Sequence, residues 1–248
     1  MLVANTTRTP MVAAYAERSD GPFYCPECAG AVVLKKGKVV VHHFAHETGS
    51  SCTFGTGESE MHRRSKWDIF RSLQSYGIEC KLEHPIGSQR ADVYAMIGGE
   101  PVAIEVQASA LTADDIARRT VGYTASGLAT IWVLTRSALP NNMAIFRPSE
   151  HARFLHRLGF GRVYYHWEGH FVVPVHFSPS YRWVESTDWG GGYYKRHKSL
   201  RRAYASGSIS LLEFASRRRP TWQDVPSCML WQDRLPRWWS TKESEVPA

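Results

Sequence analysis

The sequence predicts an α/β fold in which a helix, three antiparallel strands, a second helix and a further strand form one core. Three observations predict it. Apolar residues recur at helical spacing between residues 61 and 73, short apolar runs follow, and Gly98-Gly99 marks a tight turn between two of them. We expect this core at residues 56–137. A small β subdomain is expected at 1–55, and an unassigned C-terminal region with a hairpin and a basic segment at 138–248.

Length and charge restrict the class of protein. A chain of 248 residues can bury a substantial core, and a formal net charge of +7 favours a polyanionic partner such as nucleic acid. The sequence shows no apolar signal segment and no apolar run long enough to span a membrane. Its five cysteines are an odd number. We therefore expect a cytoplasmic, reducing setting, in which Cys-x-x-Cys indicates a metal or redox site.

The sequence of the first 55 residues predicts short strands held together by a metal ion. Strands are expected at 1–4 and 11–17, and a hairpin at 31–34 and 38–42. Thiolate and imidazole ligands select Zn²⁺, and the segment offers six of them: Cys25, Cys28, His42, His43, His46 and Cys52.

The spacing Cys25-x2-Cys28-x13-His42-x3-His46 is near that of a zinc finger, but a strand reaching His42 leaves no room for a recognition helix. We expect four ligands and hence a structural Zn²⁺. They are drawn from Cys25, Cys28, His43, His46 and Cys52. The alternative is that the cysteines are unliganded core residues and the histidines merely polar.

The first core helix is expected from residue 56 to residue 76, ending at Gly77. Glu58, His62 and Lys66 are spaced i, i+4, i+8 and therefore share one face of it. On its own, such a ladder is a solvated face. The functional alternative is that Glu58 joins acids from the strands while His62 or Lys66 contacts phosphate.

Three strands are expected next, at 78–83, 90–97 and 102–108. A two-residue loop at Gly98-Gly99 would place Asp92 directly opposite Glu105, and Arg90 opposite Gln107. Opposed carboxylates repel, so the pair predicts a divalent cation such as Mg²⁺. A four-residue loop would shift this pairing, and a three-residue loop would put the two acids on opposite faces.

Local signals place the remaining elements. Thr112 is the expected cap of the second helix, with Asp115 three residues later, and that helix should end near Gly127. A buried strand at 130–135 follows. A second hairpin is expected at 163–167 and 170–175, around Glu168-Gly169.

Positive charge is concentrated between residues 190 and 219. The cations are Lys195, Arg196, Lys198, Arg201, Arg202, Arg217, Arg218 and Arg219, with Glu213 as the acid among them. Three tyrosines, Tyr193, Tyr194 and Tyr204, alternate with them. The pattern suits contact with a nucleic-acid backbone and stacking on bases, and a solvated surface is the alternative.

Several motifs, in order, resemble one protein family. They are Tyr24-Cys25-Pro26-x-Cys28, His43-Phe44-Ala45-His46, Cys52, Glu58-Ser59-x-x-His62-x-x-x-Lys66, Arg90-Ala91-Asp92-Val93, Ile104-Glu105-Val106-Gln107-x-Ser109, Arg119-x-x-x-Tyr123 and Ile131-Trp132-Val133-Leu134. Over roughly residues 10–137 the chain is similar to the competence protein CoiA-like family. The resemblance implies a nuclease-like core of the PD-(D/E)xK superfamily, preceded by a zinc-binding segment, and DNA processing in bacteria.

By this resemblance Asp92 and Glu105 are the two motif acids, Glu58 is the helix acid, and Gln107 stands where many relatives have lysine. A lysine would help to deprotonate the attacking water, whereas a neutral amide can only orient it. A metal ion would then carry more of the activation.

The leading interpretation is a Mg²⁺- or Mn²⁺-dependent deoxyribonuclease. Glu58, Asp92 and Glu105 would hold the metal and Gln107 would position water. His62, Lys66 and Arg119 would contact phosphate. Two alternatives stay open: an inactive DNA-binding factor that delivers strands to recombination enzymes, and a zinc-stapled interaction module. DNA is the expected partner, with recombination or defence proteins beside it.

Overall fold

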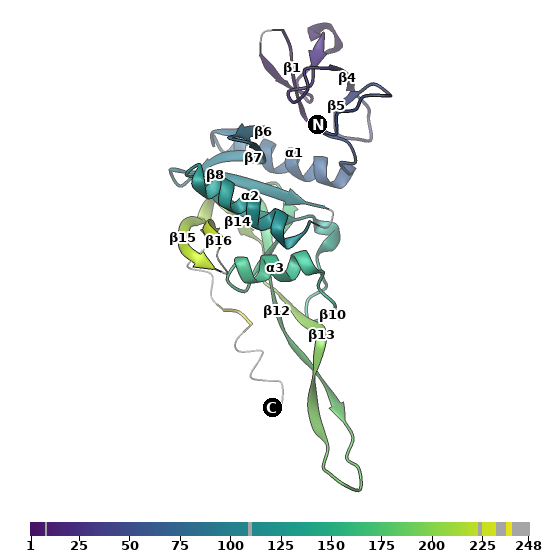
Figure 1. Cartoon of the computed structure of the whole chain (residues 1–248), viewed down its shortest axis with the longest axis vertical. Coiled ribbons are helices and arrows are strands. Elements are labelled where there is room, and N and C mark those ends of the chain that lie inside the picture. Colours follow the sequence, from purple (N-terminus) through teal and green to yellow (C-terminus); the bar gives the residue numbers. More distant parts are fainter. Residues whose placement is uncertain (8, 109–110, 223–224, 232–236, 240–248) are drawn as a thin grey trace.

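The computed structural model describes residues 1–7, 9–108, 111–222, 225–231 and 237–239; for 217–222 and 225–231 it describes the backbone alone. The chain forms a small sheet at one end, a large sheet with helices on both faces in the middle, and a long two-stranded ribbon at the other end (Figure 1). Ser109 and Cys228 lie outside the residues whose side chains are described. No helix in the described part of the chain is long and apolar enough to cross a membrane.

The N-terminal region is a five-stranded antiparallel sheet. Its strands are β1 (Val3–Asn5), β2 (Pro10–Val12), β3 (Phe23–Tyr24), β4 (Ala31–Lys35) and β5 (His43–His46), in the order β2-β1-β3-β4-β5, with a short 3₁₀ turn at Arg18–Asp20. Its core contains Phe23, Val32 and Phe44.

The expected hairpin exists between β4 and β5, but the prediction of its second strand at 38–42 is wrong. That segment is the connection, and the strand starts at His43. Val41, inside it, donates its N–H to Glu60 of the first core helix, 2.9 Å away. The Val41 N–H is therefore bonded to a side chain of the first core helix, and not to a carbonyl of a neighbouring strand as the local pattern predicted.

Helix α1 (Glu60–Ser75) starts four residues later than expected. Ser59 caps it by accepting a hydrogen bond from the His62 N–H, and Gly55 and Gly57 have φ angles of 75° and 71° that a helix does not permit. Glu58 therefore precedes the helix. One face of α1 buries Ile69 and Leu73 against the large sheet.

The core strands have the predicted order. β6 (Cys80–Ile86), β7 (Gln89–Ile97) and β8 (Glu100–Gln107) are antiparallel, and β9 (Ala129–Leu134) lies parallel to β8. The two-residue turn at Gly98-Gly99 is confirmed, because Ile97 pairs with Glu100.

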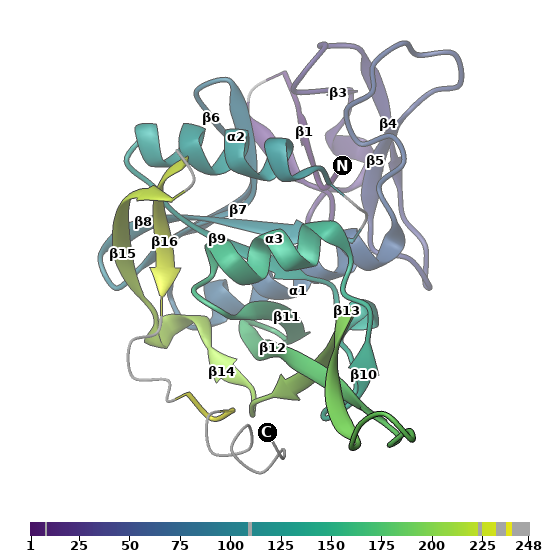
Figure 2. The same ribbon diagram turned by 60° about the horizontal axis from the view of Figure 1, so that its bottom comes forward.

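Helix α2 (Ala113–Ala125) connects β8 to β9 and covers the face of the sheet opposite α1 (Figure 2). The predicted cap is confirmed, since Thr112 Oγ1 accepts a hydrogen bond from the Asp115 N–H. Gly127 follows the helix end with a φ of 82°.

The C-terminal region continues the same sheet. After a 3₁₀ turn (Arg136–Ala138), the elements are β10 (Ile145–Phe146), α3 (Glu150–Leu158), β11 (Val163–Glu168), β12 (Phe171–Val184), β13 (Tyr193–Ala205), β14 (Ile209–Ser210), a 3₁₀ turn (Leu211–Glu213), β15 (Ala215–Trp222) and β16 (Val225–Trp231). β11 lies parallel to β9, and the predicted hairpin of β11 with β12 is confirmed. The expected boundary at residue 137 therefore does not interrupt the sheet.

Replacing Leu73 by alanine should reduce the free energy of unfolding by roughly 2–5 kcal/mol, because Leu73 is fully buried and its loss leaves a cavity. Denaturant titration of Leu73→Ala measures the change. Met61→Ala, on the same helix but 42% exposed, is the matched control and should change stability far less. Equal losses in the two variants would contradict the assigned buried face.

Candidate active site and zinc cluster

A buried lysine lies at the centre of the candidate active site. Lys66 of α1 is 3% exposed, and its ammonium group contacts the carboxylate of Glu58. Its Nζ lies 2.8 Å from Glu83 Oε1 and 3.6 Å from Asp92 Oδ1. Burial alone would lower the pKa of Lys66, but Glu83, Asp92 and Glu58 raise it above its usual value. The lysine predicted to contact phosphate is thus a charged partner of three acids.

His62 extends this network. Its Nε2 lies 3.1 Å from Asp92 Oδ2, and its Nδ1 lies 3.5 Å from Glu58 Oε1. The spacing of Glu58, His62 and Lys66 thus brings the three side chains together as predicted, although Glu58 is not part of the helix. The α-amino group of Met1 also lies 3.3 Å from Glu58 Oε2.

Asp92 lies where strands β7 and β8 separate. Their pairing follows the predicted register as far as Val93 opposite Ile104. At the next position Asp92 Oδ2 accepts a hydrogen bond of 2.9 Å from the backbone N–H of Val106. Burial alone would raise the pKa of Asp92, but His62 and Lys66 lower it below its usual value. Asp92 is therefore ionised.

Glu105 belongs to a second network, on the α2 side of the sheet. Arg119 Nη2 lies 2.7 Å from both of its carboxylate oxygens, and the Tyr123 hydroxyl donates a hydrogen bond to it. Arg119 also donates to the backbone carbonyl of Arg90 at 3.1 Å, and the Tyr123 hydroxyl oxygen lies 2.9 Å from that carbonyl. Burial is complete and raises the pKa of Glu105 to about 8, against the opposing effect of Arg119.

The expected ladder pairing of Asp92 with Glu105 is therefore absent, although Asp92 still raises the pKa of Glu105. The register is right, but the strands separate one residue too early, and each carboxylate turns to a different helix. Among the described residues, the oxygens of Glu58, Asp92 and Glu105 do not form a compact group of metal ligands. The sequence pattern could not show this, because the Val106 N–H takes Asp92 as its acceptor.

A cavity of about 550 Å³ opens beside the acids. Both helices and the 54–59 segment contribute to its wall, and the side chains that matter for chemistry are Glu58, His62, Lys66, Asp92, Gln107 and Arg119. Six of the seven residues predicted for catalysis or phosphate contact therefore share one cavity. Glu105 is the exception, because it is buried behind Arg119.

Hard oxygen ligands on this wall suit Mg²⁺ or Mn²⁺, which proteins commonly hold through one or two carboxylates plus water and phosphate. Glu58 and Asp92 provide two carboxylates at the cavity. Glu58 Oε2 is buried, and the α-amino group of Met1 lies 3.3 Å from it. These two residues therefore fit such an ion, while Glu105 fits only if Arg119 releases it.

The N-terminal sheet carries a separate metal-binding group. One ligand atom from each of Cys25, Cys28, His46 and Cys52 lies within 4.8 Å of the others. Three cysteines and one histidine are a complete set of four ligands that could bind a metal ion such as Zn²⁺. Four of the five predicted ligands are therefore assembled. The fifth, His43, instead places Nδ1 2.9 Å from the Val41 carbonyl.

Backbone amides orient the sulfur ligands. The Glu27 N–H donates to Cys25 Sγ and the Gly30 N–H donates to Cys28 Sγ, each at 3.4 Å. The hydrogen bonds from Gly30 and His46 lower the pKa of Cys28 to about 7. A thiolate at Cys28 is therefore accessible near neutral pH, as metal ligation requires.

Sequence reasoning missed Glu83. Its side chain is buried, contacts Lys66, and accepts hydrogen bonds from the backbone N–H groups of Leu2 and Val3 at 2.8 and 3.1 Å. Glu83 also has a φ of 47°, a conformation that is uncommon outside glycine and clusters at functional sites. The available signal was an acid at the end of the strand expected at 78–83, and in the structure the register of β6 and β7 places Glu83 across from Asp92.

Comparison with known proteins assigns the family. Residues 8–55 match the model of the N-terminal domain of competence protein CoiA, and residues 58–159 match the model of its nuclease-like domain. Together the two matches cover more than half of the chain. The chain belongs to the competence protein CoiA family. It is 31% identical over 127 residues to the competence protein CoiA of Bacillus subtilis (strain 168), covering 50% of this chain and 34% of that protein. No solved structure matches.

The chain thus spans about a third of the length of its curated CoiA relative. Within the CoiA family matches, the N-terminal domain contains the four zinc-site residues, and the nuclease-like domain contains Glu58, Glu83, Asp92, Glu105 and Gln107. The two clusters of side chains therefore coincide with the two family domains.

Removal of one thiolate should empty the zinc site. Purified protein is expected to carry about one zinc per chain, and Cys52→Ser should lose it because three ligands hold the ion far less tightly. Elemental analysis of the folded fraction measures this. Cys80→Ser is the matched control, since Cys80 lies outside the cluster and its thiol contacts the Phe70 carbonyl. Zinc retained in full by Cys52→Ser would contradict the assignment.

The burial of Glu105 predicts a dependence of stability on pH. Its pKa is raised in the folded state, so its contribution to stability is present below pH 4.5, its ordinary value, and is lost progressively up to about pH 8. Relative to Glu105→Gln, the wild type should therefore lose stability across this window, by at most about 1.4 kcal/mol per pH unit. Denaturant titrations of both proteins without added Mg²⁺ or Mn²⁺ test it. A difference that stays constant with pH would show that Glu105 is ionised throughout.

Proposed function

We propose that this protein is a Mg²⁺- or Mn²⁺-dependent nuclease that hydrolyses phosphodiester bonds in DNA. The observation that carries the proposal is the cavity in which Glu58 and Asp92 face Gln107 and the cations of two helices. Buried acids at the point where two strands separate have no evident role in packing, and a charge left inside a protein requires partners. The family's nuclease-like domain covers the same residues.

Each side chain of the cavity would have a separate role in the reaction. Glu58 and Asp92 would hold the ion, which when bound stabilises charge on the scissile phosphate and lowers the pKa of its water. Gln107, 8% exposed, would orient the attacking water by hydrogen bonding. Arg119 is partly exposed at the cavity wall and would contact a phosphate oxygen.

Lys66 would act within the acid cluster rather than on the bound DNA. It is more than nine-tenths buried, and three carboxylates surround it. In this role it keeps Asp92 ionised, holds Glu58 and Asp92 in place, and limits the repulsion between the acids.

A second candidate function is a catalytically inactive DNA-binding factor that assists recombination of incoming DNA. The observation that favours it is the neutral Gln107 at a position where a basic residue would activate water. The pairing of Glu105 with Arg119 favours it as well, because it withdraws one carboxylate from the cavity.

Incubating labelled DNA with the wild type and Mg²⁺ or Mn²⁺ tests the first function. Asp92→Asn should slow cleavage at least about 100-fold, because losing a ligand removes several kcal/mol of charge stabilisation. Asp114→Asn, an exposed acid in the first turn of α2, is the matched control and should cleave normally.

Thermal unfolding and zinc content establish that Asp92→Asn is folded. The nuclease is supported if the wild type and Asp114→Asn cleave DNA in a metal-dependent reaction and Asp92→Asn does not. If the wild type binds DNA but does not cleave it with either metal, the inactive DNA-binding factor is supported instead. Equal cleavage by Asp92→Asn and Asp114→Asn would refute the assigned site.

A further inference from the structure

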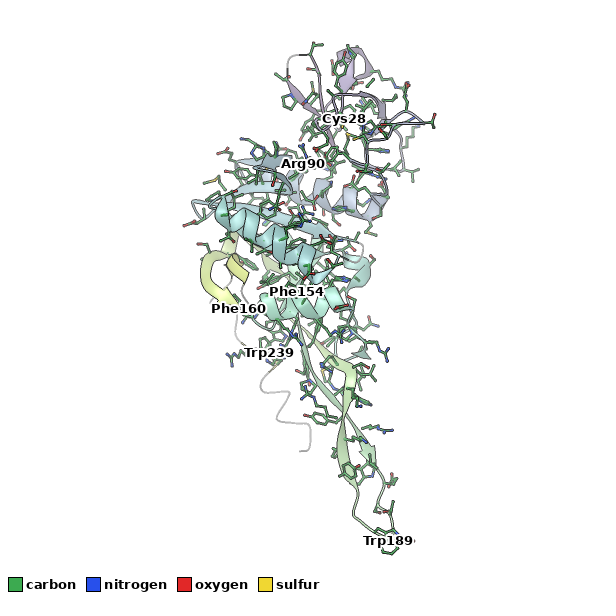
Figure 3. The ribbon with its side chains drawn as sticks, in the orientation of Figure 1. Cys28, Arg90, Phe154, Phe160, Trp189 and Trp239 are labelled. Atoms are coloured by element: carbon green, nitrogen blue, oxygen red, sulfur yellow. The ribbon has the colours of Figure 1, made fainter. Side chains whose placement is uncertain are left out.

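Strands β12 and β13 form a ribbon that extends well beyond the rest of the molecule (Figures 1 and 3). Their inner halves belong to the large sheet, where Val175 and Phe177 are buried. The outer part, residues 181–198, is called the arm here. It carries Trp189 at its tip, and this side chain is 97% exposed.

The arm exposes an unusual number of aromatic side chains. Besides Trp189, these are Tyr181, Trp183, Tyr193 and Tyr194, which are between 39% and 52% exposed. A two-stranded ribbon without a core is only marginally stable in water, and clustered exposed apolar surface marks an interaction site. The arm therefore has the composition of a binding element rather than of a packing element.

The strand register gathers three of these aromatics, Tyr181, Trp183 and Tyr194, on one face. Trp183 lies opposite Tyr194, and Tyr181 lies opposite Arg196. Because opposed residues and alternate residues share a face, these four side chains form one row. The Trp183 and Tyr194 rings are 5.1 Å apart between centroids and meet edge to face.

The Trp183 ring is also held in one position, over the backbone of Gly192. A Cβ atom built on Gly192 would lie 2.1 Å from that ring, so the ring can lie over the backbone only because residue 192 has no side chain. Holding an exposed indole in one position lowers the entropy lost when a ligand stacks on it.

Positive charge accompanies the rings. Arg182, Lys195, Arg196 and Lys198 are exposed, and none of them forms an ion pair with another described residue. The acids of the arm are Glu185 and Asp188, near the tip. Tyr204, expected from the sequence to join the stacking residues, is buried in the sheet and takes no part.

We propose that the arm binds single-stranded nucleic acid, with bases stacked on the Tyr181, Trp183 and Tyr194 row and phosphates held by the arm's cations. Stacking platforms interleaved with cations bind strands whose bases are unpaired, whereas a duplex hides the faces of its bases. A protein partner would explain the rings but not the unpaired cations. The proposal rests on the proposed function only in taking DNA as the nucleic acid.

Fluorescence anisotropy with an oligothymidylate of about 30 nucleotides tests the arm on the full-length protein. Trp183→Ala/Tyr194→Ala should weaken binding at least tenfold, and Trp183→Phe/Tyr194→Phe should restore most of it because phenylalanine still stacks. Tyr76→Ala, a 61% exposed tyrosine at the end of α1, is the matched control and should bind as the wild type does.

A second variant separates stacking from charge. Arg182→Ala/Lys195→Ala/Arg196→Ala should bind more weakly and show a shallower dependence of affinity on salt between about 50 and 200 mM. Wild-type affinity in the Trp183→Ala/Tyr194→Ala variant would overturn the proposal even if the charge variant binds poorly. Tighter binding to a duplex of equal length than to the single strand would also overturn it.

The outcome is distinguishable from a failure of the proposed nuclease function. Binding of the oligothymidylate is measured in EDTA, so that it does not depend on a metal ion in the cavity, and cleavage is measured separately with Mg²⁺ or Mn²⁺. If the wild type never cleaves DNA but the arm variants bind weakly, the nuclease proposal fails and the arm proposal holds. If cleavage is metal-dependent while arm variants bind normally, the reverse is true.

Discussion

The buried ammonium group of Lys66 is the contact on which the site depends. A charge removed from water is costly unless other charges and hydrogen bonds replace its hydration, and Glu58, Glu83 and Asp92 do so here. These acids come from the segment before α1, from β6 and from β7. One side chain thus connects the first core helix to two strands and sets the distance between them.

The separation of β7 from β8 gives the two motif acids different chemistry. Asp92 faces α1, where His62 and Lys66 hold its pKa below the usual value. Glu105 faces α2, where complete burial raises its pKa despite the Arg119 pair. Two carboxylates with pKa values displaced in opposite directions are typical of sites in which one acid stays ionised and the other exchanges a proton. The backbone divergence, rather than the identity of the residues, produces this difference.

The N-terminal subdomain also contacts residues that line the cavity. Arg90 of β7 lies 3.1 Å from Glu27, which stands between Cys25 and Cys28, and its guanidinium lies 4.8 Å from the centre of the Phe54 ring. Glu83 accepts hydrogen bonds from Leu2 and Val3 of the same subdomain. The N-terminal subdomain therefore supports Arg90 and Glu83, which belong to the wall of the cavity.

The sequence by itself determined the order of the core elements and the register of β7 with β8, although not the strand expected at 38–42 or the start of α1. Periodicity, the Thr112 cap and the Gly98-Gly99 turn depend on neighbours in the chain, and all three are present in the structure. Spacing likewise identified the zinc-site residues and the Glu58, His62 and Lys66 ladder. Only the tertiary structure decided which long-range partner each polar group has. It excluded His43 from the cluster, added Glu83, and paired Glu105 with Arg119. The reason is that buried polar groups must be satisfied by atoms whose proximity no local pattern encodes.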